Sequence, residues 1–70
     1  MKAFCTQILM KADGGYDRST TMHDTLDDAE KQFHQNMVTA MSKQDYVKAI
    51  IFVINEDGEI KFRRVWKRGA

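Results

Sequence analysis

The chain of 70 residues contains no proline and a single cysteine, Cys5. It also has no internal repeat and no low-complexity run, and 43% of its residues are hydrophobic and 30% charged. This composition is typical of a folded globular domain and excludes disorder except at the extreme ends. A chain this short buries only about 60% of the surface that its unfolded form exposes. Cys5 has no partner for an intramolecular bridge, so we expect a partner subunit to supply the missing stability.

Long apolar runs are also absent. The opening segment, MKAFCTQILMK, is basic and then apolar, but its apolar part is too short and too polar for a signal peptide or a membrane span. An unpaired thiol suits a reducing compartment. We therefore predict a cytoplasmic protein that does not enter the membrane.

Charge is nearly balanced but unevenly placed. The formal net charge is +1. Residues 1–60 carry six Lys or Arg against ten Asp or Glu, whereas residues 61–70 carry five positive side chains and no acid. The C-terminal stretch is therefore a local basic excess that the rest of the chain compensates.

The order of elements follows from the periodicity and the turn residues. Residues 2–23 alternate in hydrophobicity around a turn that contains two glycines, which predicts a hairpin. Residues 46–67 form a second pair of β-rich segments around Asn55-Glu56-Asp57-Gly58. Between them, Thr25 precedes acidic residues in the manner of a helix N-cap. One apolar stripe then predicts a helix over residues 25–43; its members are Leu26, Ala29, Phe33, Met37, Ala40 and Met41.

The second turn sets the register of the last two strands. If Asn55–Gly58 forms a type I turn with Gly58 as the bulge residue, Ile54 lies opposite Ile60 and Phe52 opposite Phe62. A two-residue loop would instead place Phe52 opposite Arg63 and mix apolar with charged positions. A slip of one residue turns every side chain over, so we predict the first register.

That register divides the apolar residues between two faces of the sheet. The face under the helix is expected to hold Ile50, Phe52, Ile54, Ile60, Phe62 and Trp66, together with Phe4, Ile8 and Met10. The opposite face is expected to show Ala3, Cys5, Leu9, Ala49, Ile51, Val53 and Val65, with Lys61, Arg63 and Lys67 among them. One helix cannot cover both faces. With these residues on it, the uncovered face should be more apolar than a solvated surface normally is.

No residue pattern in the chain indicates catalysis, a cofactor or a metal. Glu30 and His34 lie one helical turn apart near His23 and Asp24, but zinc sites need three or four converging ligands. Cys5 lies within a strand with nothing nearby in sequence to lower its pKa. Asp13-Gly14-Gly15 lacks the patterns that cradle phosphate. We therefore expect a protein that is not an enzyme, with no catalytic, cofactor-binding or metal-binding residues.

Two binding surfaces are candidates. The first is the exposed apolar face, on which we expect Leu9, Ile51, Val53 and Val65 to bind a second copy of the chain or another protein. The alternative is nucleic-acid binding through the basic C-terminal strand by Lys61, Arg63, Lys67 and Arg68. Against it, the expected register points Phe62 and Trp66 toward the helix and leaves no aromatic on the open side for base stacking. The alternative role of these charges is to protect an edge strand from unwanted pairing.

Two segments of the chain carry a resemblance to known proteins. They are Thr25-Leu26-Asp27-Asp28-Ala29, which opens the helix, and Ile51-Phe52-Val53-Ile54-Asn55, which leads to Ile60 in the closing hairpin. With them the chain resembles small ββαββ proteins of phage, prophage and gut-bacterial genomes. The likeness covers most of the length, and it implies a fold but transfers no functional residue. We thus predict one α+β domain over residues 1–70, with hairpin 2–23, helix 25–43, hairpin 46–67 and the helix on one face of an antiparallel four-stranded sheet.

Overall fold

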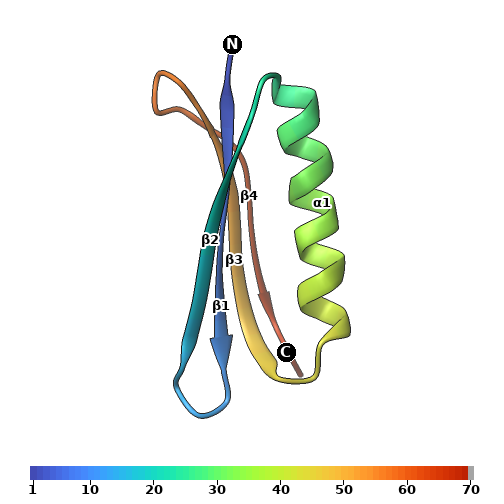
Figure 1. Ribbon diagram of the computed structural model, residues 1–70. Helices are drawn as coiled ribbons and strands as arrows, with labels where there is room; N and C mark the ends of the chain where they lie inside the picture. Colours follow the sequence, from blue (N-terminus) through green and yellow to red (C-terminus); the bar gives the residue numbers. More distant parts are fainter. Residues whose placement is uncertain (70) are drawn as a thin grey trace.

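The computed structural model describes residues 1–69 and confirms the predicted ββαββ fold. Its elements are β1 (Ala3–Lys11), β2 (Tyr16–His23), α1 (Leu26–Ser42), β3 (Tyr46–Asn55) and β4 (Ile60–Lys67). All strand pairs are antiparallel, and the strand order is β2-β1-β3-β4. Figure 1 shows α1 lying along one side of the sheet, with the other side bare. Within residues 1–69, the helical segment falls short of the length and apolarity that crossing a bilayer would take.

The two hairpins use the same turn chemistry. In the first, the Gly14 amide donates to the Lys11 carbonyl at 3.0 Å; in the second, the Gly58 amide donates to the Asn55 carbonyl at 3.0 Å. Both glycines have positive φ, 90° for Gly14 and 82° for Gly58, and both follow an aspartate. A left-handed residue at this position is what a type I turn with a glycine bulge requires. The predicted turn at Gly58 is therefore confirmed.

The ends of α1 are held by different means. At the N-terminus, the Thr25 side chain accepts a hydrogen bond from the Asp28 amide at 3.1 Å, as the capping pattern predicts. The last turn contains no basic residue. Instead Arg68, which follows β4, donates to the Lys43 carbonyl at 2.6 Å and to the Tyr46 carbonyl at 2.9 Å. A cation at the C-terminal end of a helix complements its dipole, so Arg68 ties the end of the chain to the end of the helix.

The core between α1 and the sheet combines small side chains with larger apolar ones. Fully or almost fully buried there are Ala3, Cys5 and Ala49 from the sheet and Ala29 and Ala40 from the helix. Larger members of the same cluster are Leu9, Phe33, Met37, Tyr46, Ile51 and Val53, with Leu26, Phe62 and Trp66 packed at its margin. Small residues allow a helix to approach a sheet closely. Met41, expected in the buried stripe, is 45% exposed at the end of the helix.

The predicted register of β3 and β4 is right at the turn and wrong beyond it. Ile54 pairs with Ile60, but Val53 pairs with Phe62 and Phe52 with Arg63. The register shifts because β4 contains one extra residue, Lys61, at this point. Such a bulge turns over every side chain that follows. Phe62 therefore points toward the helix, where its ring centroid lies 6.0 Å from that of Phe33, while Phe52 lies on the opposite face.

The face assignment of β1 and β3 is accordingly wrong. Leu9, Ile51 and Val53 were expected on the open side but are 6%, 0% and 0% exposed beneath α1. Ala3, Cys5 and Ala49 are buried with them. The larger apolar residues expected under the helix lie on the other face and are only partly buried; they are Phe4, Ile8, Met10, Ile50, Phe52 and Ile54. Both sets alternate with a period of two, so the pattern alone could not decide which set the helix covers.

Candidate interaction surface

The sheet surface opposite α1, called here the open face, consists of four cross-strand rows. Residues that pair across neighbouring strands share a face. In the order β2-β1-β3-β4, the rows are Met22, Phe4, Ile54 and Ile60; Thr20, Thr6, Phe52 and Arg63; Arg18, Ile8, Ile50 and Val65; and Tyr16, Met10, Lys48 and Lys67. The first row is apolar from edge to edge, and the last ends in two lysines.

The open face has an apolar centre. Ten of its sixteen positions are apolar or aromatic, two are threonine and four are basic. Four strands about 4.8 Å apart and eight residues long at about 3.3 Å per residue give a projected area of about 500 Å². Its edges are well exposed, with Tyr16 at 63% and Ile60 at 61%. The apolar part of this face is comparable with the largest apolar patch of a typical monomer, which is often functional.

The charges of the open face are all of one sign and lie mostly at its margin. Arg18 is on edge strand β2, Arg63 and Lys67 are on edge strand β4, and Lys48 is in the terminal row of β3. None of the sixteen positions is acidic. Near the middle, the Thr6 and Thr20 hydroxyls lie 3.0 Å apart and satisfy each other. An apolar centre with a charged margin is the anatomy of a protein interface.

Of the four residues predicted to form a protein interface, only Val65 lies on the open face. It is 41% exposed on β4 and pairs with Ile50. Leu9, Ile51 and Val53 are buried beneath the helix. One face of the sheet is thus uncovered, as expected, but three of the four residues predicted for a protein interface do not lie on it.

The four predicted nucleic-acid contacts are separated by the fold. Arg63 and Lys67 share the open face. Lys61, at the bulge, lines a hollow at the N-terminal end of α1, and its Nζ lies 3.8 Å from a carboxylate oxygen of Glu59. Arg68 is committed to carbonyl groups near the C-terminal end of the helix. The continuous basic strip that was expected is thus reduced to two of its members.

The sequence reasoning missed most of the residues that form the open face. The central ones are Phe4, Ile8, Ile50, Phe52 and Ile54, and the added cations are Arg18 and Lys48. One signal could have found them. Ala3, Cys5 and Ala49 stand at alternate positions, and small residues along one side of two strands indicate where a helix packs closely.

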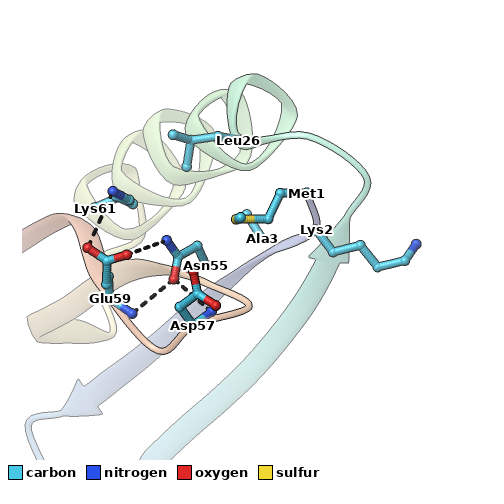
Figure 2. A pocket seen from close by; sticks show the side chains of 8 residues that line it. All are labelled: Met1, Lys2, Ala3, Leu26, Asn55, Asp57, Glu59 and Lys61. Atoms are coloured by element: carbon cyan, nitrogen blue, oxygen red, sulfur yellow. Dashed lines mark hydrogen bonds and ion pairs between the residues drawn. The ribbon is translucent and has the colours of Figure 1, made fainter.

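A hollow near the N-terminal end of α1, shown in Figure 2, does not bring catalytic groups together. It measures about 310 Å³ and is lined by Met1, Lys2, Ala3, Leu26, Asn55, Asp57, Glu59 and Lys61. Its polar groups are engaged in holding the turn. The Asn55 Oδ1 accepts from the Asp57 and Glu59 amides, each at 3.0 Å, and its Nδ2 donates to Glu59 at 3.2 Å. Asn55 is itself buried, at 6% exposure. The hollow is therefore a by-product of a well-bonded turn.

The thiol of Cys5 is enclosed beneath α1. Burial raises the pKa of Cys5 above its ordinary value, outweighing a hydrogen bond from Asn36 Nδ2 at 3.6 Å that lowers it. A nucleophilic cysteine needs the opposite shift. This geometry keeps the sulfur protonated and unreactive.

The residues considered for a metal site interact with other side chains and do not converge on one point. His34 Nε2 lies 3.5 Å from a carboxylate oxygen of Glu30, with both side chains largely in water. His23 bonds to the Thr21 hydroxyl at 2.8 Å, and Asp24 bonds to Lys2 at 2.7 Å. Across residues 1–69, no three His, Cys, Asp or Glu side chains are grouped as ligands of one ion.

Comparison of the chain with protein-family models, with curated proteins and with solved structures gives no match. The resemblance to small phage and gut-bacterial proteins is therefore supported only at the level of the ββαββ topology. Functional inference must come from the open face itself.

Proposed function

We propose that the protein is a non-enzymatic interaction module that binds a protein partner through the open face of its sheet. The observation that carries this proposal is the distribution of side-chain size between the two faces. On β1 and β3 the helix covers three small residues, Ala3, Cys5 and Ala49, beside Leu9, Ile51 and Val53. Phe4, Ile50 and Phe52 lie on the same central strands with no element above them.

Side-chain size matters because the hydrophobic gain scales with buried apolar area, at about 25 cal/mol per Å². A chain that needed only its own helix would gain most by placing its largest apolar side chains beneath it. Here both phenylalanines of β1 and β3, Phe4 and Phe52, and four further large apolar side chains are on the uncovered side, where a lone chain leaves part of their surface in water. A partner that covers the open face would recover this energy.

The test compares two matched lysine substitutions. Ile50→Lys places a charge at the centre of the open face. Val38→Lys places the same charge on the outer side of α1, where Val38 is 66% exposed. Each chain is immobilised and incubated with lysate of the source cells, and the captured proteins are quantified by mass spectrometry, with added tagged copies of the same chain included as a possible partner.

We expect the wild type and Val38→Lys to capture the same partner and Ile50→Lys to lose it. Circular dichroism must show that all three are folded. Equal capture by the three proteins, or no capture above empty beads, would overturn the proposed function.

A second candidate, single-stranded nucleic acid, is favoured by one feature of the open face. Phe4 and Phe52 stand on the two central strands, and the surrounding cations have no acid among them. Aromatic side chains on a sheet with a positive surround are the means by which sheet-based modules stack bases. The expected register left no aromatic on the open side, which counted against base stacking. The observed position of Phe4 and Phe52 removes that objection.

Titration with single- and double-stranded oligonucleotides at two salt concentrations tests this candidate. Binding through the open face should be lost in Phe52→Ala and should weaken as salt rises, because phosphate contacts release counterions. Phe62→Leu is the matched control, since Phe62 lies on the helix side. Equal binding by both variants would exclude base stacking on the open face.

A further inference from the structure

We infer that the occupant of the open face is a second copy of this chain, so that two sheets pack face to face as an isologous dimer. This inference rests on the proposed function and names the partner. A two-fold dimer requires a patch that fits itself, and it is the commonest form of oligomer. The four antiparallel strands place apolar side chains in all four rows of the open face, so two copies related by a two-fold axis can bring apolar residues against each other.

The size of the open face agrees with what a stable dimer needs. A standard interface buries about 800 Å² of accessible surface on each partner. The projected area of about 500 Å² underestimates the accessible area, because side chains protrude from the sheet and expose their flanks. One face of this sheet, paired with its copy at the usual separation of about 10 Å, is therefore of the order of size that an interface between two small subunits needs.

The composition of the central strands favours a protein surface over a polyanion. Of the eight open-face positions on β1 and β3, six are apolar, one is threonine and one is lysine. The apolar residues other than Phe4 and Phe52 are Ile8, Met10, Ile50 and Ile54, which offer no hydrogen bond to a base or a phosphate. Apolar side chains of this kind are complemented by one another, as in the interior of a two-sheet sandwich.

The cations give the dimer a distinctive response to salt. Each copy brings Arg18, Lys48, Arg63 and Lys67 and no acid to the open face. Two such surfaces repel each other, and at an ionic strength of 0.15 M the repulsion is screened beyond about 8 Å. Self-association should therefore strengthen as salt rises. Binding of an acidic protein or of nucleic acid to the same surface should weaken instead.

The experiment is sedimentation velocity on the full chain, from low micromolar to submillimolar concentration, at low and at high sodium chloride. We expect a monomer–dimer equilibrium whose Kd falls several-fold on going to high salt. Ile50→Lys should raise Kd by at least about a hundredfold, since each of the two subunits would bury an unpaired charge. Val38→Lys should leave Kd unchanged.

A second variant guards against misfolding of the first. Val65 lies on edge strand β4, and its side chain is already 41% exposed. The fold should therefore tolerate Val65→Lys, while the dimer should still weaken. A wild-type chain that stays monomeric at every concentration would overturn this inference. So would a dimer that both open-face variants leave intact. In either case, partner capture that depends on Ile50 would still uphold the proposed function.

Discussion

Two adjacent isoleucines on β3 provide a direct measure of how differently the two faces of the sheet are packed. Ile51 is 0% exposed beneath α1, whereas Ile50 is half-buried on the open face. Truncation of Ile51 to alanine removes buried carbons and leaves a cavity under the helix. Such changes cost about 2–5 kcal/mol, and the complete burial of Ile51 places Ile51→Ala at about 3–4 kcal/mol.

Ile50→Ala should cost much less in the monomer. No element lies above Ile50, so no closed cavity forms, and only part of the removed surface was out of water. At about 0.8 kcal/mol for each fully buried methylene, three carbons that are mostly but not fully buried amount to about 1.5–2 kcal/mol. The two variants should therefore differ by about 2 kcal/mol in their free energy of unfolding.

Urea unfolding followed by circular dichroism at low micromolar concentration measures both variants. A domain of 70 residues has a total stability of roughly 3.5–10 kcal/mol at 0.05–0.15 kcal/mol per residue, so Ile51→Ala removes a large share of it. If that variant does not fold, Ile51→Val and Ile50→Val give the same comparison, with Ile51→Val costing about 0.5–1.5 kcal/mol. Equal costs at the two positions, or a larger cost at Ile50, would refute the assignment of faces.

Further predictions concern single interactions. Gly58→Ala should destabilise the chain by about 1 kcal/mol in urea unfolding, because Gly58 holds a φ of 82° that alanine adopts only with strain. The Cys5 thiol, buried at 1% exposure, should react with a thiol reagent only as fast as the protein unfolds. Arg68→Met should lower the melting temperature, because the carbonyl groups of Lys43 and Tyr46 lose their donor. The Tyr46 hydroxyl donates to Asp17 at 2.6 Å, and this bond lowers the pKa of Asp17 and raises that of Tyr46. The stability it contributes should be present above the ordinary carboxyl pKa of about 3.9 and lost as pH falls through the depressed value in the folded state.

Each of these predictions has its control. Gly14→Ala, in the matching turn with a φ of 90°, should behave like Gly58→Ala. Thiol labelling faster than unfolding would show that α1 does not cover Cys5. The control for Arg68→Met is Arg64→Met, because within residues 1–69 Arg64 makes no hydrogen bond of this kind. Tyr46→Phe should lose less stability than the wild type between neutral and acidic pH, and parallel stability curves would show that the bond to Asp17 contributes nothing.

Much of the local structure follows from the sequence alone. Both hairpin turns, the cap at Thr25 and the span of the helix depend on residues within four positions of one another, and the structure has them where the pattern predicts. The type of each element was equally predictable, since a period of two or of 3.6 is a local property. The bulge at Lys61 had no such signal, because it adds a residue to a strand that alternates normally on either side.

What only the tertiary structure decided is which face of the sheet lies under the helix. β1 and β3 carry apolar side chains on both sides, so alternation offers two equivalent choices. The choice is made by packing, which places Ala3, Cys5 and Ala49 under α1 with larger residues of the same face, and leaves Phe4, Ile50 and Phe52 on the other side. Strand order and the reach of Arg68 to the helix end depend likewise on contacts between residues far apart in the chain. The open face is therefore a consequence of packing on its opposite side, which the alternation of apolar residues does not by itself determine.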